Sequence, residues 1–403
     1  MTRFSFLLPT RNRAPLLRQA LAAVLAQPGG DLEVVVSDNA SSDETPEVIR
    51  EFGDDPRLRV VRTPRPLNVV DNWEHALDHA TGEWIVVVGD DDGPVPSLVS
   101  RLDPLADPDA TRAVAWAKAW YVHPGVEPAW PVPGQENHLV VFPYGGRAEE
   151  VAAGPELEAF FRRRERATRP EMNAAVHRQV IERIRREAGR VFRGPDPAVG
   201  LCAAFLALEP SYLALDLPLV VMGLSAASIS TSLAHDLTSV HTVVREYHAA
   251  HGLRHVPLTS RTVANLVAES LLNAKEALPA HFEGVDLDRA AYFLSCGLEL
   301  KGRDDAGARR EWRAALRAEP PAVRAAVRRS MAADAARAWT RRTIQAVTPL
   351  AAARRLVRRG LEGRTDFLVL SGADHGFAHL PGAAHHLDGR LPPVPHASKP
   401  AAA

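Results

Sequence analysis

Trp84-Ile85-Val86-Val87-Val88-Gly89-Asp90-Asp91-Asp92 is an apolar, β-branched run that ends in three consecutive carboxylates. Such a run predicts a strand buried on both faces, as in a parallel sheet. Three adjacent anions repel each other, and a divalent cation relieves that repulsion; carboxylate oxygens suit Mg²⁺ or Mn²⁺. Because such a metal commonly bridges carboxylates and a diphosphate, Asp90, Asp91 and Asp92 are candidate metal ligands beside a phosphorylated substrate. Taken alone, the triplet fits a solvated acidic turn equally well.

The segments before this strand alternate between strand-like and helix-like patterns. Three apolar strand patterns and two helical spacings occur there, at residues 4–8, 32–36 and 58–61 and at residues 16–25 and 70–79. Strands that alternate with helices predict an α/β fold with a doubly wound, mostly parallel sheet. Ligands bind such sheets at the carboxyl ends of the strands. Pro9-Thr10, Asp38 and the acidic triplet all follow strands, so we expect them at one edge.

Several short motifs in this region occur in a specific order and spacing. They are Leu8-Pro9-Thr10-Arg11-Asn12-Arg13, Ser37-Asp38-Asn39-Ala40-Ser41-Ser42-Asp43, Asn72-Trp73-Glu74, Ala80-Thr81-Gly82-Glu83-Trp84-Ile85 and Gly89-Asp90-Asp91-Asp92 with Pro96 downstream. Through these motifs, residues 1 to about 105 resemble a family 2 glycosyltransferase with the GT-A fold, of the nucleotide-diphospho-sugar transferase superfamily. The resemblance fades beyond residue 110.

The resemblance implies roles for individual residues. It places the nucleotide-sugar site at Pro9, Thr10, Arg11, Asn12, Asp38, Asn72, Asp90 and Asp91. The loop after the first strand would touch base and ribose, and Asp38 would accept a hydrogen bond from the base. Asp90 and Asp91 would meet the ribose and the metal-bound diphosphate. The chain departs from the usual Asp-X-Asp spelling at Gly89, and Asp92 is an extra carboxylate, so which two aspartates hold the metal stays open.

Composition narrows the class of protein. The 403 residues carry a net charge of −1, so no overall basic field attracts nucleic acid. The two cysteines, Cys202 and Cys296, lack a metal-ligand or redox spacing. The sequence shows neither a charged leader nor an apolar run of the roughly 20 residues that a membrane helix needs. We therefore expect a cytoplasmic enzyme.

The chain is expected to divide into several parts. Residues 1–235 would form the GT-A domain, with a nucleotide-sugar half at 1–105 and an acceptor half at 106–235. A helical region at 236–330, a basic helix with a small C-terminal element at 331–391 and a disordered Pro/Ala-rich tail at 392–403 would follow. The basic residues 337–359 would contact an anionic membrane face peripherally. The alternative is a helix packed on the catalytic domain with its arginines in water.

The acceptor half contains a candidate catalytic base. Periodicity predicts a helix over 171–188 that ends at Gly189, and the segment Gly194-Pro195-Asp196-Pro197 follows. Prolines on both sides restrict the backbone and aim the side chain of Asp196, and the family places an acidic base at a comparable position. The alternative for Asp196 is a helix cap, with Pro197 at the first helical position. His177 is either a helix-surface residue or a contact to phosphate or acceptor.

The features together predict a metal-dependent, inverting glycosyltransferase. It would move a sugar from a nucleotide diphosphate-sugar to a hydroxyl acceptor, which is a glycan, a lipid-linked acceptor or a small molecule. A nucleotidyltransferase is the first alternative, although the loop at residues 9–13 lacks the Gly and Lys typical of that class. A non-catalytic nucleotide-sugar-binding protein is the second. A dinucleotide-binding oxidoreductase is disfavoured because no G-x-G-x-x-G follows the first strand.

Overall fold

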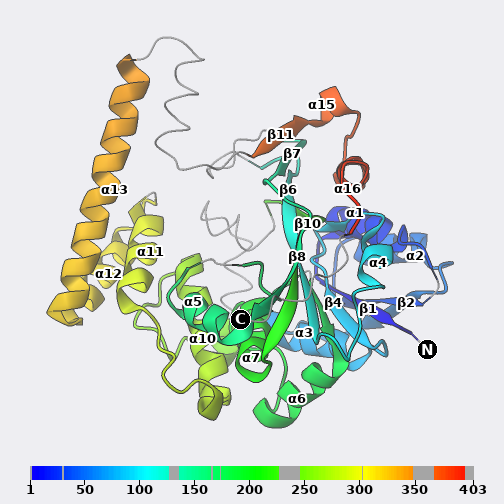
Figure 1. The fold of residues 1–403 in the computed structure, drawn as a ribbon, viewed down its shortest axis with the longest axis horizontal. Coiled ribbons are helices and arrows are strands. Elements are labelled where there is room, and N and C mark those ends of the chain that lie inside the picture. The colour runs from blue at the N-terminus through cyan, green and yellow to red at the C-terminus, as the bar shows by residue number, and fades with distance from the viewer. Residues whose placement is uncertain are drawn as a thin grey trace.

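A mixed sheet runs through the middle of the molecule (Figure 1). The computed structural model describes residues 2–29, 31–126, 136–164, 167–172, 174–226, 246–301, 303–347 and 367–394, without the side chains of residues 338–347. Eleven strands of the described residues form this sheet, and its main path has the order β11-β7-β6-β9-β4-β1-β2-β3. Strands β5, β8 and β10 pair off this path. The order is that of a GT-A fold, as expected.

The first half of the chain builds the parallel part of the sheet. Its elements are β1 (Phe4–Thr10), α1 (Ala14–Leu25), β2 (Leu32–Asp38), α2 (Thr45–Glu51), β3 (Leu58–Arg62), α3 (Val69–Asp78) and β4 (Trp84–Val87). Strand β1 lies between β2 and β4 and pairs with both in parallel. The three strands are buried almost throughout. Their carboxyl ends therefore meet at one edge, where Thr10 is the register partner of Asp38.

The helix predicted at 70–79 is α3, and its two ends are set differently. Asn68 caps the N-terminus by accepting a hydrogen bond from the Asp71 amide. The C-terminus comes at Asp78, one residue before the end of the predicted range. Gly82 lies in the loop that follows: a Cβ atom there would lie 2.7 Å from the Ser5 amide nitrogen, so only glycine lets this loop approach β1.

The second half adds antiparallel strands to the sheet. Its elements are β5 (Gly93–Pro94), α4 (Leu98–Leu102), β6 (Ala113–Val122), β7 (His138–Val141), β8 (Ala148–Ala152), α5 (Ala153–Phe161), β9 (Ala174–His177), α6 (Arg178–Ala188), α7 (Pro197–Leu208) and β10 (Ser211–Leu224). The helix predicted over 171–188 starts only at Arg178, because residues 174–177 are fully buried and pair with β4 and β6 as β9. Gly189 ends the helix at φ 82°, as predicted.

The C-terminal region is helical and then returns to the sheet. It contains α10 (Val263–Ala277), the short helix η1 (Pro279–His281), α11 (Arg289–Lys301), α12 (Ala306–Ala318), α13 (Pro321–Val347), β11 (Leu368–Ser371), α15 (Gly372–His375) and α16 (Leu380–Asp388). Helices α11 to α13 gather on one side, and α13 projects from the body (Figure 1). Strand β11 belongs to the small C-terminal element expected at 331–391 and pairs antiparallel with β7. Leu380 of α16 packs against Gly93, the residue that follows the acidic triplet in the sequence.

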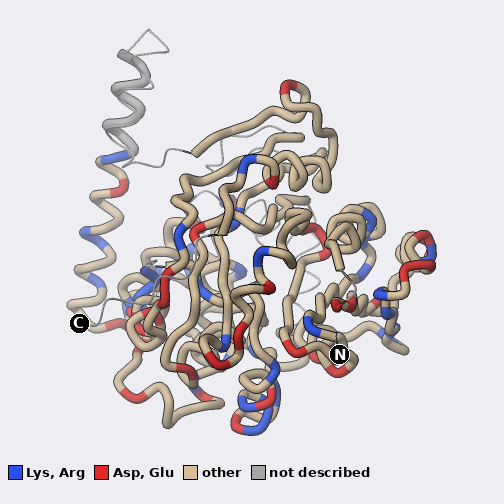
Figure 2. The backbone as a smooth tube through the Cα atoms, turned by 45° about the vertical axis from the view of Figure 1, so that its right-hand side comes forward, with Lys and Arg blue, Asp and Glu red and all other residues tan. Residues whose placement is uncertain are grey.

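Some expectations fall outside the described residues. The boundary expected at residue 235 lies within 227–245, and most of the tail lies within 395–403. The basic stretch 337–359 lies outside from residue 348 onward, and the side chains of 338–347 are not described. No helix of the described chain is long and apolar enough to cross a bilayer. Figure 2 shows Lys and Arg interspersed with Asp and Glu, in keeping with the near-neutral net charge.

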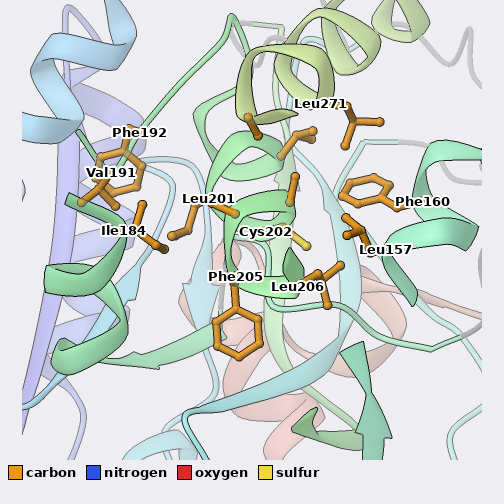
Figure 3. Packing of buried hydrophobic residues seen from close by; sticks show 14 of the residues in the cluster. Leu157, Phe160, Ile184, Val191, Phe192, Leu201, Cys202, Phe205, Leu206 and Leu271 are labelled. Atoms are coloured by element: carbon orange, nitrogen blue, oxygen red, sulfur yellow. The ribbon is translucent and has the colours of Figure 1, made fainter. Parts of the chain in front are cut away.

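Helix α7 is the centre of one of the two hydrophobic clusters. It is apolar on all sides and buried along its length. In Figure 3 its residues Leu201, Phe205 and Leu206 lie between Phe160 of α5 and Ile184 of α6, and Leu271 of α10 lies above them. A helix enclosed in this way is held firmly, because packed interiors yield little. The N-terminus of α7, where Asp196 stands, is therefore a rigid position.

Candidate active site

A cavity of about 350 Å³ lies at the carboxyl edge of the parallel strands. The loops after β1 and β4 form one side of its wall, with Thr10 and the acidic triplet. The N-terminus of α7, with Asp196, also forms part of the wall, together with the end of β10 and the start of α10. The edge predicted from sequence and the candidate base thus share one cavity.

Asp90 is bound by two residues of the β1 loop. Its Oδ2 accepts a hydrogen bond from Thr10 Oγ1 at 2.7 Å, and its Oδ1 pairs with Arg13 at 2.6 Å. Burial by itself would lower the pKa of the Arg13 guanidinium, but the three carboxylates of the triplet raise it above its ordinary value. Arg13 therefore stays charged, and it offsets much of the charge of Asp90.

Asp91 and Asp92 are held by the end of β10. Asp91 Oδ2 accepts a hydrogen bond from Ser225 Oγ at 2.9 Å, and Asp92 Oδ1 accepts one from the Gly223 amide at 3.0 Å. Burial raises the pKa of Asp91 above its ordinary value; Arg13 opposes the rise, and the charges of Asp92 and Asp90 add to it. Within the described residues Asp91 has no ion pair, so this wall carries negative charge in excess.

That excess suits a divalent cation. No group of three His, Cys, Asp or Glu side chains among the described residues is arranged to hold a metal ion alone. Mg²⁺ usually binds through one or two carboxylates together with substrate phosphates and water. The carboxylates of Asp91 and Asp92, with their hard oxygens, fit such a partial site. Asp90 fits it less well because its Oδ1 is paired with the Arg13 cation, whereas Asp92 accepts hydrogen bonds from the neutral amides of Gly89 and Gly223.

Two glycines permit this arrangement. A Cβ at Gly89 would lie 2.8 Å from Asp92 Oδ2 and 3.1 Å from Asp91 Oδ1. An aspartate there, as in the usual family spelling, would press a fourth carboxylate onto the other three. A Cβ at Gly223 would lie 1.9 Å from the Asp91 carbonyl oxygen. Both positions therefore require glycine through close approach, without any unusual backbone angle.

We expect Gly223→Ala to lower the free energy of unfolding by about 1–3 kcal/mol, the cost of overpacking a tight site. The new methyl group meets backbone and not a flexible side chain, so β10 or the triplet must move. Denaturant unfolding measures the change. Gly154→Ala is the matched control, because nothing lies within 4 Å of a Cβ there. Equal stability of the two variants would contradict the close contact at Gly223.

Asp196 is both a helix cap and a residue of the cavity wall. It caps α7 by accepting a hydrogen bond from the Val199 amide at 3.3 Å, with Pro197 in the first turn, which confirms the capping interpretation. The same residue lines the cavity. Burial raises the pKa of Asp196 to about 6, Glu171 adds to the rise, and the Val199 bond and Lys118 oppose it. The residue is therefore a half-buried carboxylate with a pKa suited to proton transfer near neutral pH.

The structure divides the residues expected to bind the nucleotide. Pro9, Thr10, Arg11, Asn72, Asp90 and Asp91 line the cavity. Asp38 and Asn12 are not among its lining residues. Asp38 instead accepts a hydrogen bond from the Ser41 amide at 2.9 Å and pairs with Arg62. Asn12, at φ 54°, accepts one from the Ser42 amide at 2.8 Å. Both therefore fix the two loops that border the cavity.

His177 is not where sequence periodicity predicted it. It ends β9, is buried, and caps α6 through its ring nitrogen. Its ring lies edge-on to Trp84, with centroids 5.1 Å apart. The helix-surface interpretation is wrong because residues 174–177 form a strand. His177 is also not among the residues that line the cavity.

The sequence of this region matches a known family. Residues 5–183 match the family described as Glycosyl transferase family 2. Residues 5–183 are a family 2 glycosyltransferase domain. The acidic triplet and the β1 loop both lie inside the match, whereas Asp196 and the end of β10 lie beyond it.

Relatives of this family 2 domain are distant. A GalNAc(5)-diNAcBac-PP-undecaprenol beta-1,3-glucosyltransferase of Campylobacter jejuni is 34% identical over 104 residues, 25% of this chain and 34% of that protein. A PGL/p-HBAD biosynthesis glycosyltransferase of Mycobacterium bovis is 33% identical over 90 residues, 22% of this chain and 35% of that protein. The succinoglycan biosynthesis protein ExoO of Rhizobium meliloti is 32% identical over 103 residues, 26% of this chain and 29% of that protein. The matches thus span about a third of each relative.

Solved structures resemble the family 2 domain in general architecture. S. aureus TarS 1-349 in complex with UDP-GlcNAc has 15% identity and a TM-score of 0.41, and the match covers 74% of this chain and 81% of that one. The mannosyltransferase PcManGT of Pyrobaculum calidifontis, in complex with GDP-Man and Mn²⁺, has 24% identity and a TM-score of 0.38. That match covers 75% of this chain and 81% of that one.

Several cavity residues of the family 2 domain were not expected from sequence. Lys118, Glu171, Met222, Gly223 and Glu246 line the cavity, and Ser225 binds Asp91. Lys118 had a signal, since it is a lone charge within the apolar strand β6. Met222, Gly223, Ser225 and Glu246 had no such signal, because the end of β10 and the helical residues 246–251 reach the site only through tertiary pairing. Glu171 had no such signal either. Glu246 accepts two hydrogen bonds from Arg11 Nη1, each of 2.9 Å.

Proposed function

We propose that this chain transfers a sugar, with inversion, from a nucleotide diphosphate-sugar to a hydroxyl group of an acceptor. One observation supports the proposal above all: a single cavity joins the acidic triplet to the half-buried carboxylate of Asp196. The family of residues 5–183 agrees with it. So do the distant relatives, which are named as glycosyltransferases.

The donor would occupy the side of the cavity next to β1 and β4. Pro9, Thr10, Arg11 and Asn72 would contact the base and ribose, since they line this side with polar and backbone groups. Asp91 and Asp92 would hold Mg²⁺ or Mn²⁺. When bound, the cation would neutralise charge on the leaving diphosphate. Asp90 would keep Arg13 and Thr10 in place and so shape the site.

Asp196 would act as the general base. Its carboxylate takes the proton of the acceptor hydroxyl while the hydroxyl oxygen forms a bond to the anomeric carbon of the sugar. The bond from that carbon to the diphosphate oxygen breaks, and its electron pair leaves with the nucleoside diphosphate. Attack from the face opposite the leaving group inverts the configuration. With a pKa of about 6, Asp196 is mostly ionised at neutral pH and is still a competent base.

We keep the expected catalytic unit and helical region as part of the proposal, with two changes. Residues up to 226 would form the catalytic unit, and the helical region would be residues 246–347, because α13 crosses the boundary expected at residue 330. Residues 367–394 would belong to the catalytic unit as well, because β11 extends its sheet and Leu380 and Leu387 of α16 are buried in its core. The peripheral membrane contact proposed for residues 337–359 rests on side chains outside the described part of the chain.

A binding and turnover panel tests the proposed function. Full-length protein is heated with nucleoside diphosphates and nucleotide sugars, with and without Mn²⁺, and nucleoside diphosphate release is measured in parallel. A ligand that binds the folded state raises its stability by mass action. We expect metal-dependent stabilisation by at least one nucleotide sugar, with slow release of the nucleoside diphosphate. Pyrophosphate release from a nucleoside triphosphate would favour a nucleotidyltransferase, and binding without any release would favour a non-catalytic protein.

Asp38→Ala should weaken nucleoside diphosphate binding by about tenfold or more, since a hydrogen bond to a charged group contributes about 1.5–3 kcal/mol. The physical reason is that Asp38 anchors the loop through the Ser41 amide and Arg62, and the loop loses this anchor in the variant. Isothermal titration measures the affinity. Arg62→Ala separates the two roles of Asp38: it weakens binding if Asp38 positions the loop, and leaves binding unchanged if Asp38 meets the base directly. Unaltered affinity in Asp38→Ala would show that this residue does not contribute to nucleotide binding.

A further inference from the structure

The cavity wall around Asp196 differs in chemistry from the wall around the acidic triplet. We propose that the acceptor is an alcohol or phenol with an apolar skeleton, and not a free sugar. This inference rests on the proposed function, because Asp196 marks the acceptor subsite only if it receives the acceptor proton. The residues beside Asp196 then form the walls that the acceptor touches.

Three segments bring side chains to the Asp196 end of the cavity. Pro195 and Pro197 flank Asp196, and Ala198 follows in the first turn of α7. The start of α10 contributes Val263 and Leu266. The Asp196 amide donates a hydrogen bond to Ser270 Oγ of α10 at 2.9 Å, so α10 is fixed against this end. The third is the segment before β9, whose Met172 also lines the cavity.

The side chains of this end are predominantly apolar. Among the cavity-lining residues that the structure describes, the ionisable side chains placed near Asp196 by their electrostatic effect on it are Lys118 and Glu171. A sugar acceptor has several hydroxyl groups, and each one needs a hydrogen-bond partner when it leaves water. Prolines, valine, leucine and methionine supply no side-chain partner of that strength. An alkyl or aryl skeleton fits these walls, and Met172 adapts to its shape.

The charges at this end also exclude an anionic acceptor. Lys118 and Glu171 have opposite charges, and Asp196 adds one negative charge when ionised. No surplus positive charge therefore remains on the described wall to hold a phosphate or carboxylate. The donor side is different, because Thr10, Arg11, Asn72 and the acidic triplet supply polar groups there. The donor wall thus combines these polar groups with the apolar side chains of Leu67, Val69 and Trp73, whereas the acceptor wall is apolar apart from Asp196, Lys118 and Glu171.

Acceptor competition tests the proposal on the full chain. The donor is the nucleotide sugar whose nucleoside diphosphate is released fastest, and the acceptor probes are 1-octanol, phenol and glucose. We expect kcat/KM for 1-octanol or phenol to exceed that for glucose by about tenfold or more. Glucose used equally well or better overturns the proposed acceptor class. Donor hydrolysis without transfer to either apolar probe overturns it too, and both results leave the donor site standing.

A matched pair of variants on α10 links the effect to the wall. Val263→Thr replaces a cavity-lining methyl group by a hydroxyl of similar size, and Val267→Thr makes the same change one turn along α10, away from the cavity lining. We expect Val263→Thr to raise KM for the preferred apolar probe about fivefold. Val267→Thr should leave this KM unchanged. Equal KM values for both variants and the parent would overturn the assignment of this wall. A parent chain that does not hydrolyse any donor would instead count against the proposed function itself.

Discussion

Asp196→Asn is expected to lower the turnover of sugar transfer by about 100-fold or more, as loss of a general base does, while nucleoside diphosphate binding stays unchanged. Asparagine caps helices as well as aspartate does, so the bond to the Val199 amide is retained. The variant therefore removes the base and keeps the cap. Steady-state kinetics give the turnover, and titration calorimetry gives the nucleotide affinity.

The pH dependence of activity follows from the same residue. A base must be deprotonated to accept a proton, and the pKa of Asp196 lies near 6. Turnover of the parent chain should thus rise through pH 6 and level off above it. Asp196→Asn should lose this acidic limb. A parent profile that is flat between pH 5 and 7 would exclude Asp196 as the base.

The free energy of unfolding should change with pH in the opposite direction to turnover. Burial raises the pKa of Asp196 from its ordinary value of 3.8 to about 6. A raised pKa means that ionisation costs the folded state stability, so stability falls between pH 4 and 6 and stays lower above pH 6. The loss amounts to roughly 3 kcal/mol, and Asp196→Asn should recover it above pH 6 but not below pH 4. A variant that is both inactive and less stable at pH 8 would favour a purely structural role.

Asp305→Asn is the matched control. Asp305 caps α12 by accepting a hydrogen bond from the Ala308 amide at 2.8 Å and does not line the active-site cavity. The change is chemically the same at a helix N-terminus of the same kind. We expect normal turnover and an unchanged pH profile. Loss of turnover in this variant as well would show that the assay reports folding and not catalysis.

Local patterns predicted the parts of the fold that depend on neighbouring residues. The apolar run before the triplet and the alternating elements before it are set by periodicity within short windows, and the corresponding strands and helices formed as predicted. Residues 174–177 show the limit. Four residues are too few for periodicity to separate a strand from a helix start, and their pairing with β4 and β6 decided the outcome.

Local sequence patterns predict less of the site than of the fold. Asp196 and the triplet could be selected as candidates from the sequence because their distinctive features lie in consecutive residues. Gly223 and Ser225 are 131 and 134 residues away from the aspartates they bind, and no local pattern links them. The position of Asp38 also could not be predicted, since a carboxylate at a strand end has the same sequence whether it faces a ligand or a neighbouring arginine.

Asp91→Asn is expected to reduce sugar transfer to below about 1% of the parent value, because a cation at a transferring diphosphate is worth several kcal/mol. The substituted amide has the shape of the parent carboxylate and can still accept the hydrogen bond from Ser225, but it lacks the negative charge that faces a cation. Mn²⁺ should no longer tighten nucleoside diphosphate binding. Titration with and without Mn²⁺ measures this effect directly, and full activity with unchanged metal dependence would show that the metal assignment is wrong.

Asp90→Asn tests whether the metal contact is specific to Asp91. Removing one of three adjacent negative charges at Asp91 relieves repulsion, so the metal-free Asp91→Asn protein should be at least as stable as the parent. Asp90, by comparison, pairs with Arg13, whose side chain is 21% exposed. Loss of one partner of a fully buried pair costs about 3–5 kcal/mol, and partial exposure of Arg13 should reduce this to about 2 kcal/mol. We therefore expect Asp91→Asn to be inactive and stable, and Asp90→Asn to be both impaired and destabilised, because one carboxylate faces the ligand and the other holds the loop.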